Sequence, residues 1–247
     1  MSTQIHGNLA VWAGPPGERG RVRELIVMSK EPAAGRSKTR VAHALSVRCG
    51  AGQALTLSEE LAWALLADSV EVCAAAAAEA GALLRVCHSP SAPGARFCEL
   101  LRSLAPGVDL EPQCEGELGD RLAHAMRRGV ARVVVGMDTP DIPLTAFAAA
   151  FRASSEGRVA LGPAHDGGYY LLALPAELPG ASLSNPGIRW SAPTTAEDTL
   201  GALGPWPVTR LPELVDVDRP EDLARFRLPG PGAARTRAWV KERWAWL

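Results

Sequence analysis

Residues 25–40 read LIVMSKEPAAGRSKTR, and this stretch decides both the fold class and the first functional hypothesis. Its apolar start predicts a strand over residues 25–29, and a helix is expected from about residue 39. In the loop between them Gly35 permits a tight turn, while the charge is concentrated on Lys30, Arg36, Lys38 and Arg40. Helix N-terminal amides and fixed cations both favour a polyphosphate, so the loop is predicted to bind phosphates.

This loop has two other interpretations. Single basic residues in loops are usually just solvated, but four within eleven residues beside an apolar strand are less ordinary. The pair Lys38-Thr39 also resembles the end of a Walker A loop, but Ser37 stands where that motif requires glycine before the lysine. A P-loop ATPase is therefore not expected, and Thr39 stays in the predicted phosphate-binding set.

Composition narrows the classes of function. The 247 residues are 47% hydrophobic, enough for a sizeable core, and 26 basic against 27 acidic residues leave a net charge of −1. That balance gives no overall field for nucleic acid, so we expect no nucleic-acid partner. The 5 cysteines are odd in number and form no Cys-x-x-Cys pair, which favours free thiols in a reducing compartment.

Patterning along the chain predicts one domain with two extensions. Residues 1–23 contain Gly and Pro without a sustained apolar period and are expected to be a flexible leader. The domain is expected over 24–228 and a helical tail over 229–247. No apolar run suggests a signal peptide or an uncharged membrane span, so we expect a cytoplasmic protein with no membrane partner. Tryptophans in the tail, namely Trp239, Trp244 and Trp246, either form a homodimer contact or dock on the chain's own core.

Alternating elements predict an α/β fold. Further apolar runs at 83–87, 133–136, 159–162 and 169–174 are typical of strands, and a long helix is expected to begin at Ser58 as N-cap. The alanines at 74–78 indicate a packed or fraying helix end. Short, fully apolar strands suit a parallel sheet covered on both faces, in which ligands bind at the carboxyl ends of the strands.

Carboxylates follow several of these strands. Asp138 comes two residues after the run at 133–136, and Asp216 and Asp218 lie near the end of the domain. Divalent cations prefer carboxylate oxygens and commonly join one or two of them to substrate phosphates, so these three predict a Mg²⁺ or Mn²⁺ site. Asp218 also fits a helix N-cap before Pro220, and Asp216 fits a simple turn.

Two glycine-containing loops carry further candidates. Asp166, Gly167, Gly168 and Tyr169 follow another strand, and they form either a hairpin turn or a close backbone approach to a substrate. The neighbouring His165 is more often idle than a general base in such a position.

A second such loop, residues 113–121, opens a helix. It contributes Gly119 and Arg121 as candidates for nucleotide or phosphate binding. Arg121 either reaches a phosphate or pairs with Glu117 across one helical turn.

Taken in order, these motifs resemble the GT-A-type nucleotide-diphospho-sugar transferases of the DUF2064 group, related to molybdenum-cofactor and phospholactate nucleotidyltransferases. The resemblance covers about residues 24–226. Its matching pieces are Lys30-x-Pro32-x-x-Gly35-x-x-Lys38-Thr39-Arg40, Gly116-x-Leu118-Gly119-x-Arg121, Gly136-x-Asp138-x-Pro140, Leu161-Gly162-Pro163-x-x-Asp166-Gly167-Gly168-Tyr169, Trp190-Ser191 and Asp216-x-Asp218-x-Pro220-x-Asp222.

The resemblance implies a single Rossmann-like GT-A domain with a mostly parallel mixed central sheet flanked by helices, a bound nucleotide and a divalent metal. On this basis Lys38, Arg40 and Asp138 are the predicted catalytic residues. Trp190 and Ser191 join the hairpin as the predicted substrate-binding residues. The chain departs from the pattern at Gly136, where an Asp-x-Asp motif would place an acid.

Three functions follow from these observations. The first is a glycosyltransferase that uses a nucleotide-diphospho-sugar and a small-molecule acceptor. The second is a nucleotidyltransferase that joins a nucleoside triphosphate to a phosphorylated acceptor and releases pyrophosphate. The third, a nucleotide-binding module without activity, ranks last because the candidate metal carboxylates are present.

Overall fold

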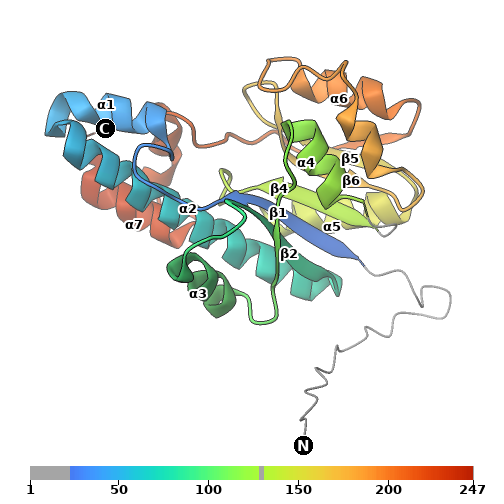
Figure 1. Cartoon of the computed structure of the whole chain (residues 1–247), viewed down its shortest axis with the longest axis horizontal. Coiled ribbons are helices and arrows are strands. Elements are labelled where there is room, and N and C mark those ends of the chain that lie inside the picture. Colours follow the sequence, from blue (N-terminus) through green and yellow to red (C-terminus); the bar gives the residue numbers. More distant parts are fainter. Residues whose placement is uncertain (1–22, 128–130, 247) are drawn as a thin grey trace, which may run out of the picture.

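A seven-stranded sheet forms the centre of the computed structural model, which describes residues 23–127 and 131–246 (Figure 1). Its strand order is β3-β2-β1-β4-β6-β5-β7; β6 runs antiparallel to both of its neighbours, and the other pairs are parallel. The strands are β1 (Glu24–Lys30), β2 (Leu83–Ser89), β3 (Asp109–Pro112), β4 (Arg132–Gly136), β5 (Val159–Pro163), β6 (Tyr169–Leu174) and β7 (Val208–Arg210). The predicted α/β fold with a mostly parallel mixed sheet is confirmed.

Helices cover both faces of this sheet. The α-helices are α1 (Thr39–Cys49), α2 (Ala51–Ala80), α3 (Ala95–Leu104), α4 (Leu118–Ala125), α5 (Leu144–Ser155), α6 (Thr195–Leu203) and α7 (Ala234–Arg243). Short 3-10 helices are η1 (Gly180–Ser184), η2 (Pro220–Arg227) and η3 (Trp244–Trp246). The sequence pattern did not predict β3 or β7, because both are short, partly exposed edge strands without an apolar run.

The predicted start of the long helix was wrong. Ser58 is not an N-cap but a buried residue inside α2, where its hydroxyl donates to the carbonyl of Leu55. The break lies earlier, at Gly50, whose φ of 82° ends α1 and lets α2 begin at the next residue. Ala76 and Ala77 are buried near the C-terminal end of α2, in agreement with the predicted packed helix end.

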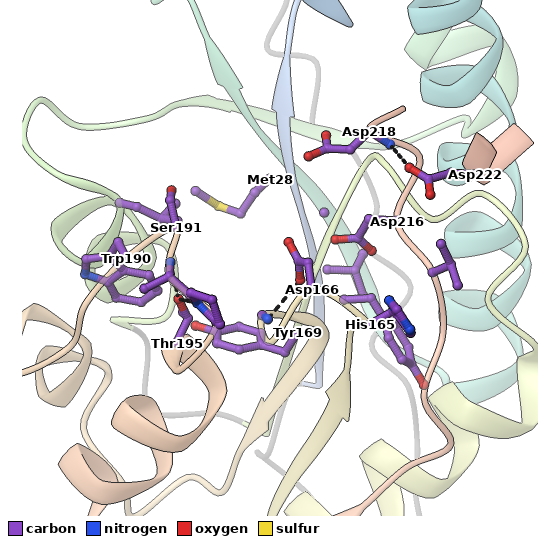
Figure 2. A pocket seen from close by; sticks show the side chains of 18 of the residues that line it. Met28, His165, Asp166, Tyr169, Trp190, Ser191, Thr195, Asp216, Asp218 and Asp222 are labelled. Atoms are coloured by element: carbon purple, nitrogen blue, oxygen red, sulfur yellow. Dashed lines mark hydrogen bonds between the residues drawn. The ribbon is translucent and has the colours of Figure 1, made fainter. Parts of the chain in front are cut away.

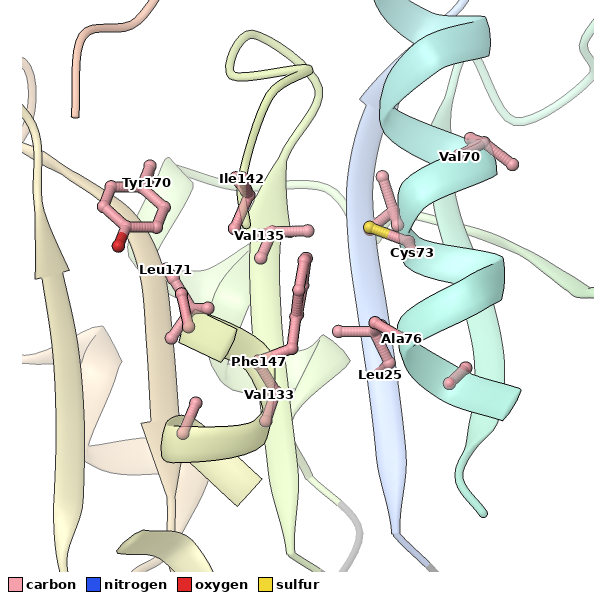
Figure 3. Packing of buried hydrophobic residues seen from close by; sticks show 14 of the residues in the cluster. Leu25, Val70, Cys73, Ala76, Val133, Val135, Ile142, Phe147, Tyr170 and Leu171 are labelled. Atoms are coloured by element: carbon pink, nitrogen blue, oxygen red, sulfur yellow. The ribbon is translucent and has the colours of Figure 1, made fainter. Parts of the chain in front are cut away.

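Alternation along β1 explains why helices lie on both faces. Leu25 and Val27 point to the face covered by α2, α3 and α5, which Figure 3 shows around Cys73, Val133 and Phe147. Ile26 points to the opposite face, covered by α4 and α6. Burial of both faces accounts for the short, fully apolar strands.

A third cluster lies beyond the sheet, where α1, the first half of α2, η2 and α7 pack together. The carboxylate of Asp68, on α2, accepts hydrogen bonds from the backbone amides of Arg235 and Thr236 and so caps α7 from another helix. Trp239 is buried in this cluster, so this residue of the predicted tail docks on the chain's own core. Trp244 packs against the same cluster, and a homodimer contact stays a prediction.

Helix α2 is long and apolar enough to cross a membrane by length and composition. However, 67% of its most apolar stretch is buried inside the protein, as expected for a core helix. The five cysteines form no disulfide, and Cys73 and Cys87 are buried.

Two buried arginines fix the C-terminal end of α4. Arg85, on β2, donates to the carbonyl of Ala125 and forms ion pairs with Glu24 and Glu111. Arg132, on β4, donates to the carbonyl of Met126 and to two carbonyls of the segment 175–178. Cations suit the orphan carbonyls at a helix C-terminus. Because this end is anchored, the N-terminal end of α4 is held at the opposite edge of the sheet.

Candidate active site

The cationic loop joins β1 to α1 at the carboxyl edge of the sheet. Gly35 has a φ of 72°, and the Ser37 hydroxyl accepts a hydrogen bond from the amide of Ala33, which closes the turn. Lys38 adopts a left-handed conformation, with φ 48° and ψ 46°, directly before α1. Such a conformation is uncommon for a residue with a side chain and is found most often where the surroundings impose it.

Neighbouring residues fix the side chain of Lys38 in place. It is only 7% exposed, and its ammonium donates to Oδ1 of Asp138 and to the carbonyl of Val217, both at 2.5 Å. Asp138 follows β4 and is 42% exposed. The predicted cation and the predicted metal carboxylate therefore form an ion pair with each other.

Asp216 lies on an extended segment fixed at both sides of it. The Leu214 amide donates to the Pro163 carbonyl at 3.1 Å, and the Val217 amide donates to the Asp138 carbonyl at 2.9 Å. The Thr139 hydroxyl donates to Oδ1 of Asp216 at 2.5 Å.

Burial is the main cause that raises the pKa of Asp216 to about 6. The Thr139 hydrogen bond opposes this shift, whereas the negative charges of Asp138 and Asp166 add to it. The charges of Asp138 and Asp166 thus both act on Asp216 at this edge of the sheet.

Asp218 forms an ion pair with Arg40 at 2.5 Å, and both side chains are about half exposed or more. Of the two alternatives for Asp218, the role as helix N-cap is wrong. The N-cap of η2 is Arg219, and Asp222 accepts the amides of Asp218 and Arg219 at 2.9 and 2.7 Å. Because the cap falls one residue later, the Asp218 carboxylate is available to other partners.

Two neighbouring cavities open around these residues. The loop cavity, of about 370 Å³, is lined by Lys30, Arg36, Ser37, Lys38, Thr39, Arg40, Ala62, Met137, Asp138 and Asp218. The main cavity, of about 530 Å³, lies beside it and shares Arg40 and Asp218 with it. Its other lining residues include Met28, Leu118, Leu122, His165, Asp166, Gly168, Tyr169, Trp190, Ser191, Asp216, Arg219 and Asp222 (Figure 2).

The predicted hairpin at Asp166 is confirmed, since it joins the antiparallel strands β5 and β6. Asp166 accepts the amide of Gly168 at 2.9 Å. Gly167 has a φ of 88°, and a Cβ on it would lie 2.0 Å from the carbonyl oxygen of Pro193. Its glycine is therefore required for contact with the segment 189–195 rather than with a ligand.

The segment 189–195 carries Trp190 and Ser191 to the main cavity. Arg189 is bound by both carboxylate oxygens of Asp198 at 2.9 Å, which anchors the segment to α6. Ser191 has a φ of 57° and is exposed at the cavity. Like Lys38, it is a residue other than glycine in the left-handed region beside the candidate site.

The structure gathers most of the predicted site residues around the two cavities, but not all of them. A Cβ on Gly119 would lie 2.5 Å from the Leu183 carbonyl oxygen and 2.9 Å from Nε1 of Trp190, so this glycine permits close packing. Arg121 donates to the carbonyl of Gly116, where pairing with Glu117 had been one alternative. Gly35, Gly119, Gly167 and Arg121 are absent from the linings of both cavities.

The carboxylates fit a divalent cation shared with a ligand better than a cation held by protein alone. Among residues 23–127 and 131–246 no group of three or more His, Cys, Asp or Glu side chains is placed to hold a metal ion. Mg²⁺ in phosphate-transfer sites commonly uses one or two carboxylates and completes its shell with phosphate oxygens and water. Asp138 and Asp216 fit that donor set, since the charge of Asp138 acts on Asp216 and raises its pKa.

Sequence reasoning missed the apolar side of the site and the residues that orient its carboxylates. Leu118 and Leu122 line the main cavity from the first turns of α4, and Met28 does so from β1. Thr139 follows Asp138 directly, and its hydroxyl beside a predicted metal ligand was a usable signal. The apolar residues gave no such signal, because an apolar side chain in an α/β core is the ordinary case.

Comparison with known proteins bears on the family resemblance and on the fold. The DUF2064 family, described as an uncharacterized protein conserved in bacteria, matches residues 72–192. A solved structure from Desulfovibrio desulfuricans G20, named a putative nucleotide-diphospho-sugar transferase, is 27% identical with a TM-score of 0.67, over 91% of this chain and 96% of its own. Rv0371c from Mycobacterium tuberculosis H37Rv, solved alone and as a manganese complex, is 16% and 17% identical, with TM-scores of 0.48 and 0.45 over 83% of this chain and 96% and 97% of its own. No curated protein matches. The resemblance to the DUF2064 group and the fold that it implies are confirmed.

Proposed function

We propose that this chain, matched to the DUF2064 group over residues 72–192, is a metal-dependent transferase that moves a glycosyl group from a nucleotide-diphospho-sugar to a small acceptor. The name of the similar protein from Desulfovibrio supports the donor class. The observation that carries the proposal is the arrangement of cations and carboxylates across the loop cavity.

The ion pairs Lys38–Asp138 and Arg40–Asp218 bring opposite charges together where a donor diphosphate and a divalent cation would meet. Both carboxylates in these pairs are 42% or more exposed, so a ligand can reach them. A diphosphate offers Lys38 and Arg40 new anionic partners, and a cation does the same for the carboxylates. When the diphosphate binds Lys38 and Arg40, the carboxylates of Asp138 and Asp218 become available to the cation. When the cation binds the carboxylates, the two basic side chains become available to the diphosphate.

In the proposed reaction an acceptor oxygen attacks the anomeric carbon of the donor sugar. The bond from that carbon to the diphosphate oxygen breaks, and the electron pair leaves with the nucleoside diphosphate. Lys38 and Arg40 stabilise the charge that develops on this leaving group. Asp138 and Asp216 would hold a divalent cation, which supplies further charge neutralisation at the diphosphate.

A nucleotidyltransferase is the second candidate. The density of the cationic loop favours it, because four cations within eleven residues suit a nucleoside triphosphate. In that reaction a phosphate oxygen of the acceptor attacks the α-phosphorus of the triphosphate, and pyrophosphate leaves. The inactive-module hypothesis ranks last, since Asp216 is held in place by Thr139 and by two backbone hydrogen bonds.

Analysis of phosphorus products distinguishes the two candidates. The protein is incubated with Mn²⁺, a panel of nucleotide-diphospho-sugars or nucleoside triphosphates, and a mixture of neutral and phosphorylated sugars, and the products are followed by ³¹P NMR. Release of a nucleoside diphosphate without pyrophosphate is the expected result. Pyrophosphate that forms only with a phosphorylated acceptor would overturn the proposal in favour of the nucleotidyltransferase.

A further inference from the structure

The main cavity has two chemically different walls. Figure 2 shows Met28 and Trp190 on one side and the carboxylates of Asp166 and Asp216 on the other. The cavity is about 530 Å³, which is large enough for a small organic molecule. Because the loop cavity already contains the cations suited to the diphosphate, the main cavity is left for the acceptor.

The apolar wall is rigid. Trp190 packs so closely on α4 that a Cβ on Gly119 would lie 2.9 Å from its Nε1, and Leu122 continues the wall from α4. The anchored C-terminal end of α4 and the Arg189–Asp198 pair hold both sides of this contact. A fixed indole face favours a ligand with a flat apolar face, and it keeps the ordering cost of binding low.

The carboxylate wall has an excess of negative charge. Four aspartates line the main cavity, namely Asp166, Asp216, Asp218 and Asp222, against two arginines, Arg40 and Arg219. Arg40 is paired with Asp218 and also lines the loop cavity. Asp166 is exposed on the hairpin, oriented by the Gly168 amide, and can accept hydrogen bonds from a ligand.

We infer that the acceptor is a polyhydroxyl compound without a phosphate group, whose apolar face packs on Trp190 and whose hydroxyl groups donate to Asp166. This inference rests on the proposed function for the identity of the ligand as an acceptor. A phosphate at Asp166 would bring like charges together, whereas a hydroxyl finds an acceptor there. A hydroxyl nucleophile must also lose its proton, and Asp166 is placed to receive it, whereas a phosphate nucleophile needs no base.

Saturation-transfer NMR with three matched probes tests the inference without donor or metal. Glucose, glucosamine and glucose 6-phosphate are compared at equal concentration on the full chain, each with Trp190→Ala and Asp166→Asn variants. Glu213→Gln is the control, because Glu213 is exposed on the segment of Asp216 and lines neither cavity. Asparagine at 166 retains an oxygen for the Gly168 amide, so this variant changes charge rather than loop geometry.

Glucose and glucosamine are expected to give the stronger signals, and Trp190→Ala is expected to weaken both by about 2- to 10-fold. Asp166→Asn is expected to strengthen the glucose 6-phosphate signal by about 2- to 10-fold relative to the wild type. The inference is overturned if glucose 6-phosphate binds best to the wild type through Trp190, or if none of the three probes gives a signal. Pyrophosphate release in the product analysis would refute the proposed function alone, since probe selectivity is measured independently.

Discussion

Two pairs of cations in this molecule are bound in opposite ways. Arg85 and Arg132 are each 1% exposed, and their guanidinium groups bind carbonyls and carboxylates in the interior. Lys38 and Arg40 instead pair with Asp138 and Asp218, which are 42% and 48% exposed at a cavity.

The first pair fixes α4 against the sheet, and even its most exposed carboxylate partner, Glu111, is only 17% exposed. The second pair has partners that a ligand can replace. Exposure of the partner, rather than that of the cation, separates the two cases, because the Lys38 side chain is itself only 7% exposed. A cation that is buried together with its partner stabilises the fold, because removing either one leaves a buried charge unpaired. A buried cation whose partner is accessible can instead exchange that partner for a ligand.

The largest expected effect is on the first pair. Arg85→Met should lower the free energy of unfolding by about 3–5 kcal/mol, because Glu24 and Glu111 lose a buried guanidinium and the Ala125 carbonyl loses its donor. Urea unfolding measures this loss. An unfolding free energy within about 1 kcal/mol of the wild type would show that this pair is no more structural than a surface ion pair.

The second prediction concerns Asp138, the exposed partner of Lys38. Asp138→Asn should leave the fold intact but lower metal-dependent turnover by about 100-fold or more, since the amide keeps the size and removes the charge. Steady-state rates with Mn²⁺ measure the effect, and Glu213→Gln should match the wild type. A rate near that of the wild type would refute the metal assignment of Asp138.

The sequence alone predicts the cationic loop and Asp138 but not the roles of Arg85 and Arg132. The cationic loop and Asp138 closely follow apolar strands, so strand periodicity and loop chemistry were enough to place them together. Arg85 and Arg132 lie inside or at the start of such strands, and no local pattern distinguishes a buried arginine from one on an edge. Their partners on α4 come from tertiary packing, as does the Asp68 cap of α7.

Acid unfolding tests how much Glu111, a partner of Arg85, contributes to stability. Burial works to raise the pKa of Glu111, but the Arg127 hydrogen bond and the charge of Arg85 outweigh it and hold the pKa below its ordinary value. A lowered folded-state pKa gives stability that is present above the unfolded-state pKa and is lost as pH falls through the folded-state pKa. Glu111→Gln should cost about 1 kcal/mol at pH 7 and flatten the loss of stability below about pH 4.3. An unchanged acid-unfolding curve would contradict this.

The smallest expected effect is the most specific for the ion pairs at the cavity. Arg40→Gln removes a positive charge beside the proposed cation site and leaves the negative charge of Asp218 without this ion-pair partner. Mn²⁺ affinity without nucleotide should therefore rise by about 2- to 5-fold, while nucleotide affinity falls. Electron paramagnetic resonance of free Mn²⁺ measures the affinity. Arg36→Gln removes the same charge from the loop that precedes α1; because Arg36 is not paired with Asp218, its effect should be smaller. Equal effects of the two variants would mean that only the overall charge matters.

In the proposed function, Lys38 and Arg40 exchange their carboxylate partners for a donor diphosphate. Thermal melting with nucleotide-diphospho-sugars and Mn²⁺, on the wild type and Lys38→Met, tests this exchange most directly. At about 100 times its dissociation constant the donor should stabilise the wild type by about 2.7 kcal/mol, or about 5–10 °C. The wild type is expected to show this shift, and Lys38→Met is expected to lose it. The exchange is contradicted if no nucleotide shifts the wild type, or if Lys38→Met shows the same shift.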